Sequence, residues 1–183
     1  MQLMIYIFLA NGFEEVEALA TVDVLRRASL DVTMVGVGSD VITGAHGIGA
    51  ICDAVDSDVE PDDELEAVVL PGGMPGTLNL ERSEKVNEFI DFAADNGRLI
   101  CAICAAPSIL GHKGLLKGGT AVCFPGFESE LEGATVADSF VVDDGNIITA
   151  KGMGSAVKFG VAIGARFVGE AKMKKIEESL QCS

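Results

Sequence analysis

The chain has 183 residues, of which 49% are hydrophobic and only 5% aromatic, and it contains 22 glycines and no tryptophan. This length fits a single domain, residues 1–183, and the aliphatic, glycine-rich composition is typical of parallel α/β sheets. The 28 acidic residues outnumber the 13 Lys and Arg and give a net charge of −15, which disfavours binding to nucleic acid or to an anionic membrane.

Five cysteines, an odd number, are spread through the chain, which does not suggest a disulfide framework. We find no signal peptide, and the first apolar run, residues 3–9, is too short to cross a bilayer. We therefore expect a cytoplasmic protein with no membrane association. Cys182, close to the end of the sequence, is expected to be inert.

Strand-like and helix-like patterns alternate along the chain without a linker. The run 3–9 predicts a first strand, and the acidic residues after Asn11-Gly12 begin a helix that extends to about residue 29. The other expected elements are a strand over 31–36, a short antiparallel pair within 39–60, a strand over 67–70, a helix over 83–96, strands over 98–104 and 120–124, a hairpin over 139–149, and helices over 155–168 and 171–180. This order predicts a doubly wound, mainly parallel sheet sandwiched between helices, and such folds bind ligands beyond the carboxyl ends of their strands.

The most informative segment is an apolar run that ends at Cys104 and is followed by small residues and Pro107. The run is typical of a buried strand, and proline is tolerated in the first turn of a helix. Cys104 is therefore expected in a strand-to-helix turn, with Ala102 and Ala106 in the places of the two glycines of a serine nucleophile elbow. A helix start favours negative charge, so we expect a lowered pKa and a reactive thiol, rather than one more small buried hydrophobe.

Three further motifs follow the ends of expected strands. Glu17 shares a helix face with Phe13, so its carboxyl can point toward the same edge of the sheet, where burial would raise its pKa and let it donate a hydrogen bond. Gly72-Gly73 can turn backbone amides toward a bound oxygen anion, although ordinary tight turns use the same pair. The segment 151–155, KGMGS, lacks the lysine-serine pair of a phosphate-binding P-loop.

Other roles for the cysteines and histidines are weighed against these. Cys101-x-x-Cys104 has the spacing of a redox dithiol, but Cys101 lies inside the apolar strand. A zinc site made by Cys101, Cys104 and Cys123 lacks a second paired ligand motif. Cys123 is expected to approach the pocket as a resolving thiol, and His46 and His112 are expected to be surface or packing residues.

In order and spacing, five segments resemble the ThiJ/PfpI superfamily, in the branch of the parkinsonism-associated protein deglycase and its bacterial relatives. They are residues 12–17 (GFEEVE), 22–28 (VDVLRRA), 70–73 (LPGG), 102–107 (AICAAP) and 151–154 (KGMG). The resemblance covers nearly the whole chain and implies a flavodoxin-like fold, a homodimer and no cofactor. It also implies a nucleophilic cysteine at Cys104, a glutamate hydrogen-bonded to it at Glu17, and oxyanion-binding amides at Gly73 and Ala105, next to Gly72.

The sequence departs from that family at two positions. Many members carry a histidine just before a proline near the cysteine, and this chain has Phe124 there, so a peptidase triad has no obvious base. A loop arginine that lines the pocket in the deglycase branch falls at Gly47. The expected pocket wall is formed by Cys123, Phe124, Lys151 and Gly152.

These features predict a cysteine-dependent enzyme that acts on α-oxoaldehydes or on early glycation adducts. The Cys104 thiolate would attack the aldehyde carbon, and Glu17 would move a proton between the two substrate carbons. The alternative is a redox-sensing, stress-protective protein whose Cys104 oxidises to sulfinic acid. A cysteine peptidase is the weakest of the three interpretations.

Overall fold

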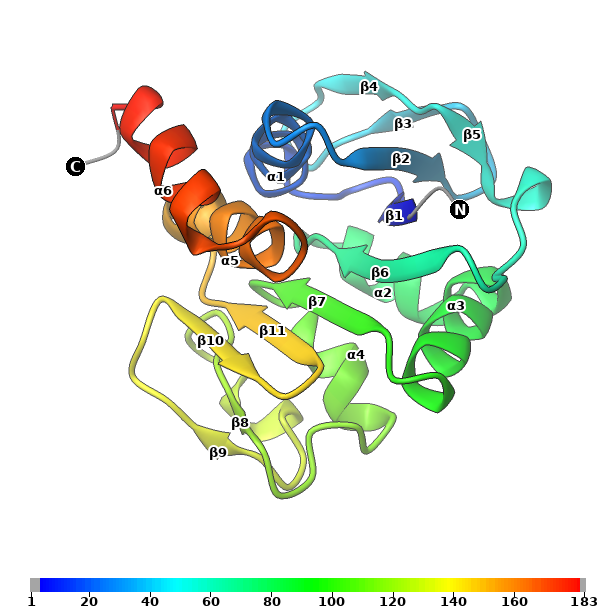
Figure 1. Cartoon of the computed structure of the whole chain (residues 1–183). Helices are drawn as coiled ribbons and strands as arrows, with labels where there is room; N and C mark the ends of the chain where they lie inside the picture. The colour runs from blue at the N-terminus through cyan, green and yellow to red at the C-terminus, as the bar shows by residue number, and fades with distance from the viewer. Residues whose placement is uncertain (1–3, 182–183) are drawn as a thin grey trace.

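A seven-stranded sheet runs through the middle of the protein, which a computed structural model describes for residues 4–181 (Figure 1). Its strands, in spatial order, are β10 (Val141–Asp144), β11 (Ile147–Ala150), β7 (Leu99–Ile103), β6 (Leu65–Leu70), β1 (Met4–Leu9), β2 (Asp31–Gly36) and β5 (Ala54–Val55). All neighbouring strands are parallel except β10 and β11. The order β2-β1-β6-β7-β11 is that of flavodoxin-like folds, and the predicted doubly wound sheet is confirmed.

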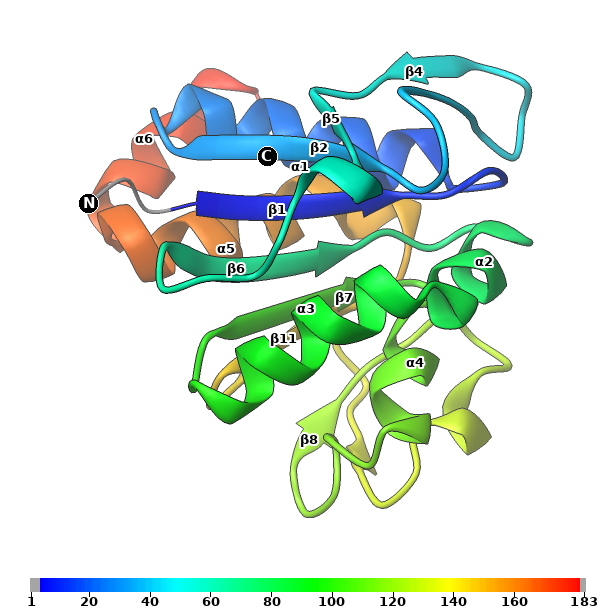
Figure 2. The ribbon, with the colours of Figure 1, turned by 90° about the vertical axis from the view of Figure 1, so that its right-hand side faces the viewer.

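Helices cover both faces of the sheet (Figure 2). The helices α1 (Glu15–Arg27) and α5 (Ala156–Val168) pack on one face, with α6 (Glu170–Ser179) against α5, and α2 (Gly76–Arg82), α3 (Glu84–Asp95) and α4 (Pro107–His112) cover the other. The strand period of two distributes the side chains of β1 between the layers. Ile5 and Ile7 pack in the core under α1 and α5, and Phe8 packs in the core under α3. There the rings of Phe8 and Phe89 meet edge to face, with their centroids 4.9 Å apart.

Two small sheets lie beside the main one. The first is the antiparallel pair β3 (Val41–Thr43) and β4 (Gly49–Ile51), which confirms the pair predicted within 39–60. The second is β8 (Thr120–Ala121) with β9 (Thr135–Val136). Within residues 4–181, three short 3-10 helices, η1 (Asp56–Asp58), η2 (Glu128–Glu130) and η3 (Met153–Ser155), complete the elements.

Most predicted elements agree with the structure, but two differences have local causes. The strand predicted over 120–124 stops at Ala121, because Phe124 and Pro125 begin the turn that leads to η2. The helix α2 was not predicted, since its sequence begins with the glycine of a Pro-Gly turn. The predicted first strand and helices are otherwise confirmed to within a few residues, while Leu3 and Cys182 lie outside the described residues.

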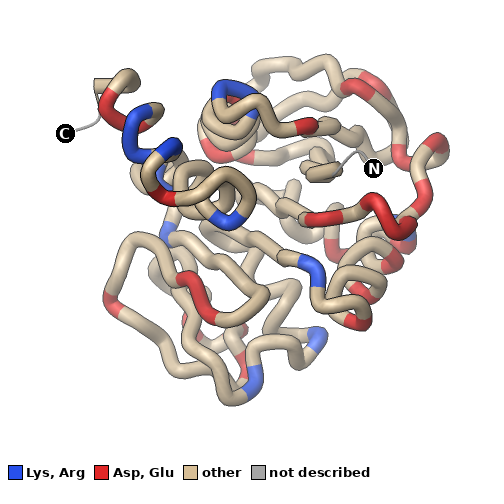
Figure 3. Tube along the Cα trace, in the orientation of Figure 1, with Lys and Arg blue, Asp and Glu red and all other residues tan. Residues whose placement is uncertain are grey.

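The charge is unevenly distributed over the surface. Asp and Glu concentrate in the segment from η1 to the start of β6 and on α3, while several Lys lie on α6 (Figure 3). The acidic residues of that segment are Asp56, Asp58, Glu60, Asp62, Asp63, Glu64 and Glu66. Within residues 4–181, no helix is both long enough and apolar enough to span a membrane.

Candidate active site

Cys104 lies in the turn between β7 and α4, as predicted, and its backbone is held in an unusual conformation. Its φ angle is 66°, in the left-handed region that costs a non-glycine residue about 1–2 kcal/mol. Two hydrogen bonds hold it there: the Cys104 amide donates to the carbonyl of Ala150 at 2.9 Å, and the Phe124 amide donates to the carbonyl of Cys104 at 2.8 Å. The neighbouring strand and loop thus present the thiol at the carboxyl edge of the sheet.

Glu17 reaches the same edge from α1 and contacts the thiol. Its side chain hydrogen-bonds to Cys104, and its Oε2 accepts the amide hydrogen of Gly72 at 2.9 Å. Glu17 is 1% exposed, and this burial raises its pKa to about 7, although bonds from Cys104, Gly72 and Met153 act in the opposite direction. The carboxyl can therefore gain and lose a proton near neutral pH.

The glycine pair after β6 is required by this close packing. A Cβ at Gly72 would lie 2.5 Å from the Cβ of Cys104 and 2.6 Å from Oε2 of Glu17. Gly73 has a φ of 91°, and a Cβ there would lie 2.3 Å from the Glu14 amide nitrogen. The absence of both side chains lets the β6 turn pass directly over the thiol and the carboxyl.

The pKa of Cys104 differs from the sequence-based expectation. Burial, followed by the Glu17 carboxylate, raises it to about 12, while hydrogen bonds from the Gly73 and Ala105 amides lower it without reversing the shift. The prediction of a lowered pKa is therefore wrong, because the helix start was considered without the buried carboxylate beside it. Protonation of Glu17 removes the nearby negative charge and so makes a thiolate at Cys104 less unfavourable, although burial continues to oppose it.

A cavity of about 360 Å³ opens over this pair. Its wall includes Gly73, Ala105, Phe124 and Met153, together with His46. Phe124, an apolar residue, thus lines the cavity at the position where many members of the ThiJ/PfpI superfamily carry a histidine.

A second, mainly apolar groove of about 340 Å³ adjoins the first and shares Phe124 and Met153 with it. Lys151 and Gly152 line this second groove rather than the cavity over Cys104, which corrects their expected place. Both hollows are mainly apolar, and the polar groups of Glu17 and Cys104 line the first of them.

Cys52, Cys101 and Cys123 do not line the cavity. Cys123 is 3% exposed and packs in the core under α3 and α4, lining neither hollow, contrary to the expectation for it. Cys101 is fully buried in β7, in agreement with the argument against a dithiol. Among residues 4–181, the only close group of three metal-ligating side chains is Glu14, Glu15 and His46, so the three cysteines form no zinc site there.

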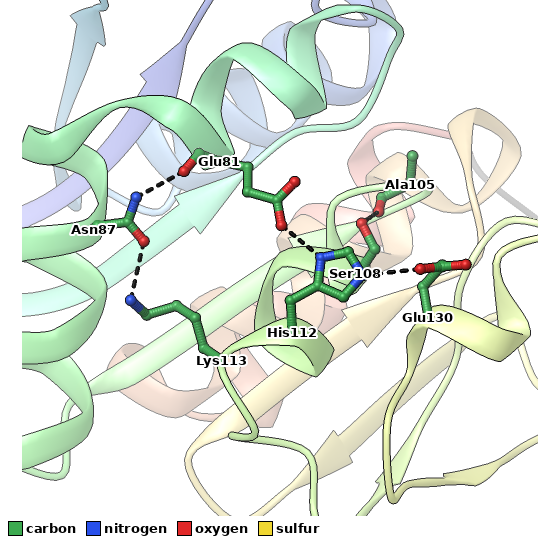
Figure 4. Close-up of polar contacts among 7 residues, drawn as sticks. All are labelled: Glu81, Asn87, Ala105, Ser108, His112, Lys113 and Glu130. Atoms are coloured by element: carbon green, nitrogen blue, oxygen red, sulfur yellow. Dashed lines mark hydrogen bonds and ion pairs between the residues drawn. The ribbon is translucent and has the colours of Figure 1, made fainter.

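The two histidines have different environments. His112, at the end of α4, lies between Glu81 and Glu130, with its ring nitrogens 2.5 and 2.9 Å from their carboxylates (Figure 4). His46 lines the cavity over Cys104, and neither histidine hydrogen-bonds to the thiol in the described part of the chain. His46 is the functional candidate that sequence reasoning missed, because only a long-range contact with α1 brings its loop to the cavity.

Comparison with known proteins places the whole arrangement in a family. Residues 4–166 match the DJ-1/PfpI family. The chain is 36% identical over 174 residues to protein DJ-1 homolog B of Arabidopsis thaliana, which is 93% of this chain but only 40% of that protein. It is 33% identical to a protein of Pyrococcus abyssi named deglycase, over 80% of this chain and 89% of that one.

Solved structures agree with this match. A DJ-1 superfamily protein from Salmonella typhimurium superposes with a TM-score of 0.92 at 35% identity, over 99% of this chain and 98% of the other. DJ-1 from Toxoplasma gondii in an oxidised form superposes with a TM-score of 0.93 at 28% identity, over 98% of each chain. The likeness therefore extends over the sheet, the helices and the turn that holds the cysteine.

Proposed function

Since the chain belongs to the DJ-1/PfpI family, we propose that it is a cofactor-independent glyoxalase or protein deglycase with Cys104 as the nucleophile and Glu17 as the proton carrier. The substrates are α-oxoaldehydes or early glycation adducts. The observation that carries the proposal is the contact of Cys104 with Glu17 and with the Gly73 and Ala105 amides at the floor of one cavity. The relative named deglycase supports the same class of reaction.

The first step forms a bond between sulfur and the aldehyde carbon. With the shared proton on Glu17, the Cys104 thiolate adds to that carbon, and the carbonyl electron pair moves to the oxygen. The amides of Gly73 and Ala105 donate to this oxyanion, and Glu17 then protonates it to give a hemithioacetal. Glu17 is left as a carboxylate, ready to accept the next proton.

The second step moves hydrogen between carbons. The Glu17 carboxylate removes the C1 proton while the second carbonyl oxygen takes a proton, and the enediol that forms is protonated at C2 by the same carboxyl. The C1 hydroxyl gives up its proton to the group or solvent that protonated the second oxygen, which leaves a thioester of a 2-hydroxy acid. Water then cleaves the carbon–sulfur bond of the thioester and frees Cys104. For an early glycation adduct, the bond from C1 to the amine or thiol of the modified protein breaks as Cys104 bonds to C1, and the leaving group takes the proton of Glu17.

Turnover of methylglyoxal without glutathione tests this function. We expect Cys104→Ser and Glu17→Gln each to lower kcat/KM by at least about a hundredfold, while Cys123→Ala, in the core, changes it little. Glu17→Gln also removes the carboxylate charge, so alkylation of Cys104 by iodoacetamide at pH 8 should become faster as turnover falls. Undiminished turnover in Cys104→Ser would contradict the proposal.

A redox role is the second candidate, and the half-buried thiol beside a carboxyl that can donate a hydrogen bond favours it. A peroxide would oxidise the thiolate to sulfenic and then sulfinic acid, and be reduced to water at each step. Protonated Glu17 would hold the new oxygen. Sulfinic acid at Cys104 by mass spectrometry, together with absent turnover in the unoxidised protein, would favour this role over the enzyme.

The proposal also includes a homodimer. Four exposed apolar side chains, Val16 and Leu19 on α1 with Ile48 and Ile51 at β4, support it. The Ile48 amide lies 3.4 Å from the Glu15 carboxylate, so these residues come from adjoining segments. We call them the α1–β4 patch.

A further inference from the structure

A second polar cluster opens on the cavity over Cys104. It joins Glu15, the first residue of α1, to His46, in the loop between β3 and β4. Gly44 makes room for it, since a Cβ there would lie 2.3 Å from the carboxyl carbon of Glu15. The absence of a side chain at Gly44 therefore lets the loop backbone approach the Glu15 carboxylate closely.

The contacts fix the orientation of the histidine. Oε1 of Glu15 accepts the amide hydrogens of His46 at 2.8 Å and of Ile48 at 3.4 Å, and Oε2 lies 2.9 Å from Nδ1 of His46. Glu15 is buried, with a side chain only 5% exposed, whereas the His46 side chain is 67% exposed. Nδ1 is thus the nitrogen turned to α1, and Nε2 makes no hydrogen bond within residues 4–181.

The proposed reaction requires a donor that the other residues do not provide. In the reaction of an α-oxoaldehyde, the Gly73 and Ala105 amides donate hydrogen bonds to the aldehyde oxygen, and Glu17 removes the C1 proton. The second carbonyl oxygen gains negative charge when that proton leaves, and a positioned donor lowers this barrier. The cavity wall includes the apolar side chains of Phe124 and Met153, which cannot supply such a donor.

We propose that His46, positioned by Glu15, donates a proton from Nε2 to the second carbonyl oxygen of the substrate, in place of the histidine that Phe124 replaces. This inference rests on the proposed function. As Glu17 removes the C1 proton, the C1–C2 double bond forms and the oxygen takes the Nε2 proton, which gives the enediol. When Glu17 protonates C2, the C1 hydroxyl proton returns through solvent to His46 and restores the imidazolium.

The electrostatic surroundings fit a protonated imidazole. The hydrogen bond to Glu15, followed by the charges of Glu14 and Glu15, raises the pKa of His46. Burial alone would raise the pKa of Glu15, but the bonds from the His46 ring and the loop amides lower it to about 2, so the carboxylate stays ionised. These two carboxylates face His46 from α1, and Glu17 and Cys104 are the other titratable groups of the cavity.

The test is the pH profile of methylglyoxal turnover, measured in EDTA so that no metal is bound at the cluster. The variants are His46→Gln, His46→Arg and Glu15→Gln, with His112→Gln as the matched control. His112 is also held by two carboxylates but lies outside the cavity. Alkylation of Cys104 by iodoacetamide, which needs no second donor, reports whether the site is intact.

We expect His46→Gln to lower kcat by about a hundredfold while alkylation of Cys104 stays within twofold. His46→Arg should keep more activity and lose the alkaline decline that deprotonation of His46 causes. Glu15→Gln should move that decline to lower pH, because the hydrogen-bonded carboxylate no longer raises the pKa of His46. His112→Gln should match the unaltered protein.

Three results would overturn the inference, and they can be told apart. Full turnover and an unchanged pH profile in His46→Gln would reject the role of His46 while the proposed function stands. Absent turnover in the unaltered protein, with Cys104 still open to alkylation, would reject the function and this role together. A loss of alkylation in His46→Gln that equals the loss of turnover would show that the residue only maintains the fold of the site.

Discussion

At the scale of single residues, two weak acids, the Glu17 carboxyl and the Cys104 thiol, lie in contact at the site. Burial raises the pKa of both Glu17 and Cys104, and the Glu17 carboxylate adds to the shift of the thiol. In the proposed reaction, the nucleophile forms by moving the proton onto Glu17 rather than by losing it to solvent. The burial that raises the pKa of Glu17 also makes its ionised form unfavourable in the folded protein.

This burial predicts how Glu17→Gln changes the pH dependence of stability. The folded pKa of about 7 lies above the ordinary value of 4.5. Between these values the folded state binds more protons than the unfolded state, so the contribution of Glu17 to stability is present below pH 4.5 and is lost as pH rises to 7. Glutamine removes this loss, so the variant should gain stability, relative to the unaltered protein, more at pH 8 than at pH 4.5.

Urea unfolding at the two pH values measures the difference. The exposed Glu132→Gln serves as the control and should show no such dependence. An equal effect of Glu17→Gln at both pH values would mean that Glu17 titrates like an exposed carboxyl.

At the scale of elements, the site is formed where two loops of the sheet and the helix α1 come into contact. The β6–α2 turn passes over the β7–α4 turn, and α1 supplies the carboxyl between them. In a doubly wound sheet these ends lie together because neighbouring parallel strands point the same way. The separation of the turns is set by Gly72, at which even one methyl group has no room.

Gly72→Ala tests this packing. A Cβ 2.5 Å from that of Cys104 forces the two turns apart, and we expect the free energy of unfolding to fall by about 1–3 kcal/mol. Turnover should fall as well, since Glu17 and Cys104 lose their contact. Gly154→Ala is the control, because a Cβ there meets no atom within 4 Å; equal stability of the two variants would show that the turns adapt.

At the scale of the whole molecule, the surface combines strong negative charge with a local apolar area. The net charge of −15 opposes non-specific association, so a contact between two copies needs an apolar surface of its own. The α1–β4 patch provides one, with Ile51 76% exposed and Ile48 57% exposed. It adjoins the loop that carries His46, so the proposed contact between two copies would lie next to the cavity over Cys104.

Ile51→Glu tests the proposed homodimer. A buried, unpaired carboxylate at the patch opposes association, so light scattering should change from twice the chain mass of 19.0 kDa to that mass itself. Val136→Glu, on β9, should leave the mass of the dimer unchanged. A mass of one chain for the unaltered protein at micromolar concentration would contradict the homodimer.

Much of the fold could be predicted because its signals are local. The apolar runs of β6 and β7, the cap at Ser83 and the glycine that ends α3 each depend on neighbours within a few residues. The short β8 and the helix α2 were misjudged, since β8 pairs with distant β9 and α2 begins at a residue that usually marks a turn.

For the site, the sequence by itself determined that Cys104 lies between a buried strand and a helix that begins with proline, and that glycines follow β6. Both can be predicted from a few adjacent residues, because a tight turn needs small residues and proline is tolerated in the first turn of a helix. Only the tertiary structure decided the pKa of the thiol and the place of His46. The contact of Cys104 with Glu17 and the contact of His46 with Glu15 each bring together residues that are far apart in the chain. A local sequence pattern does not show which distant residues will be in contact.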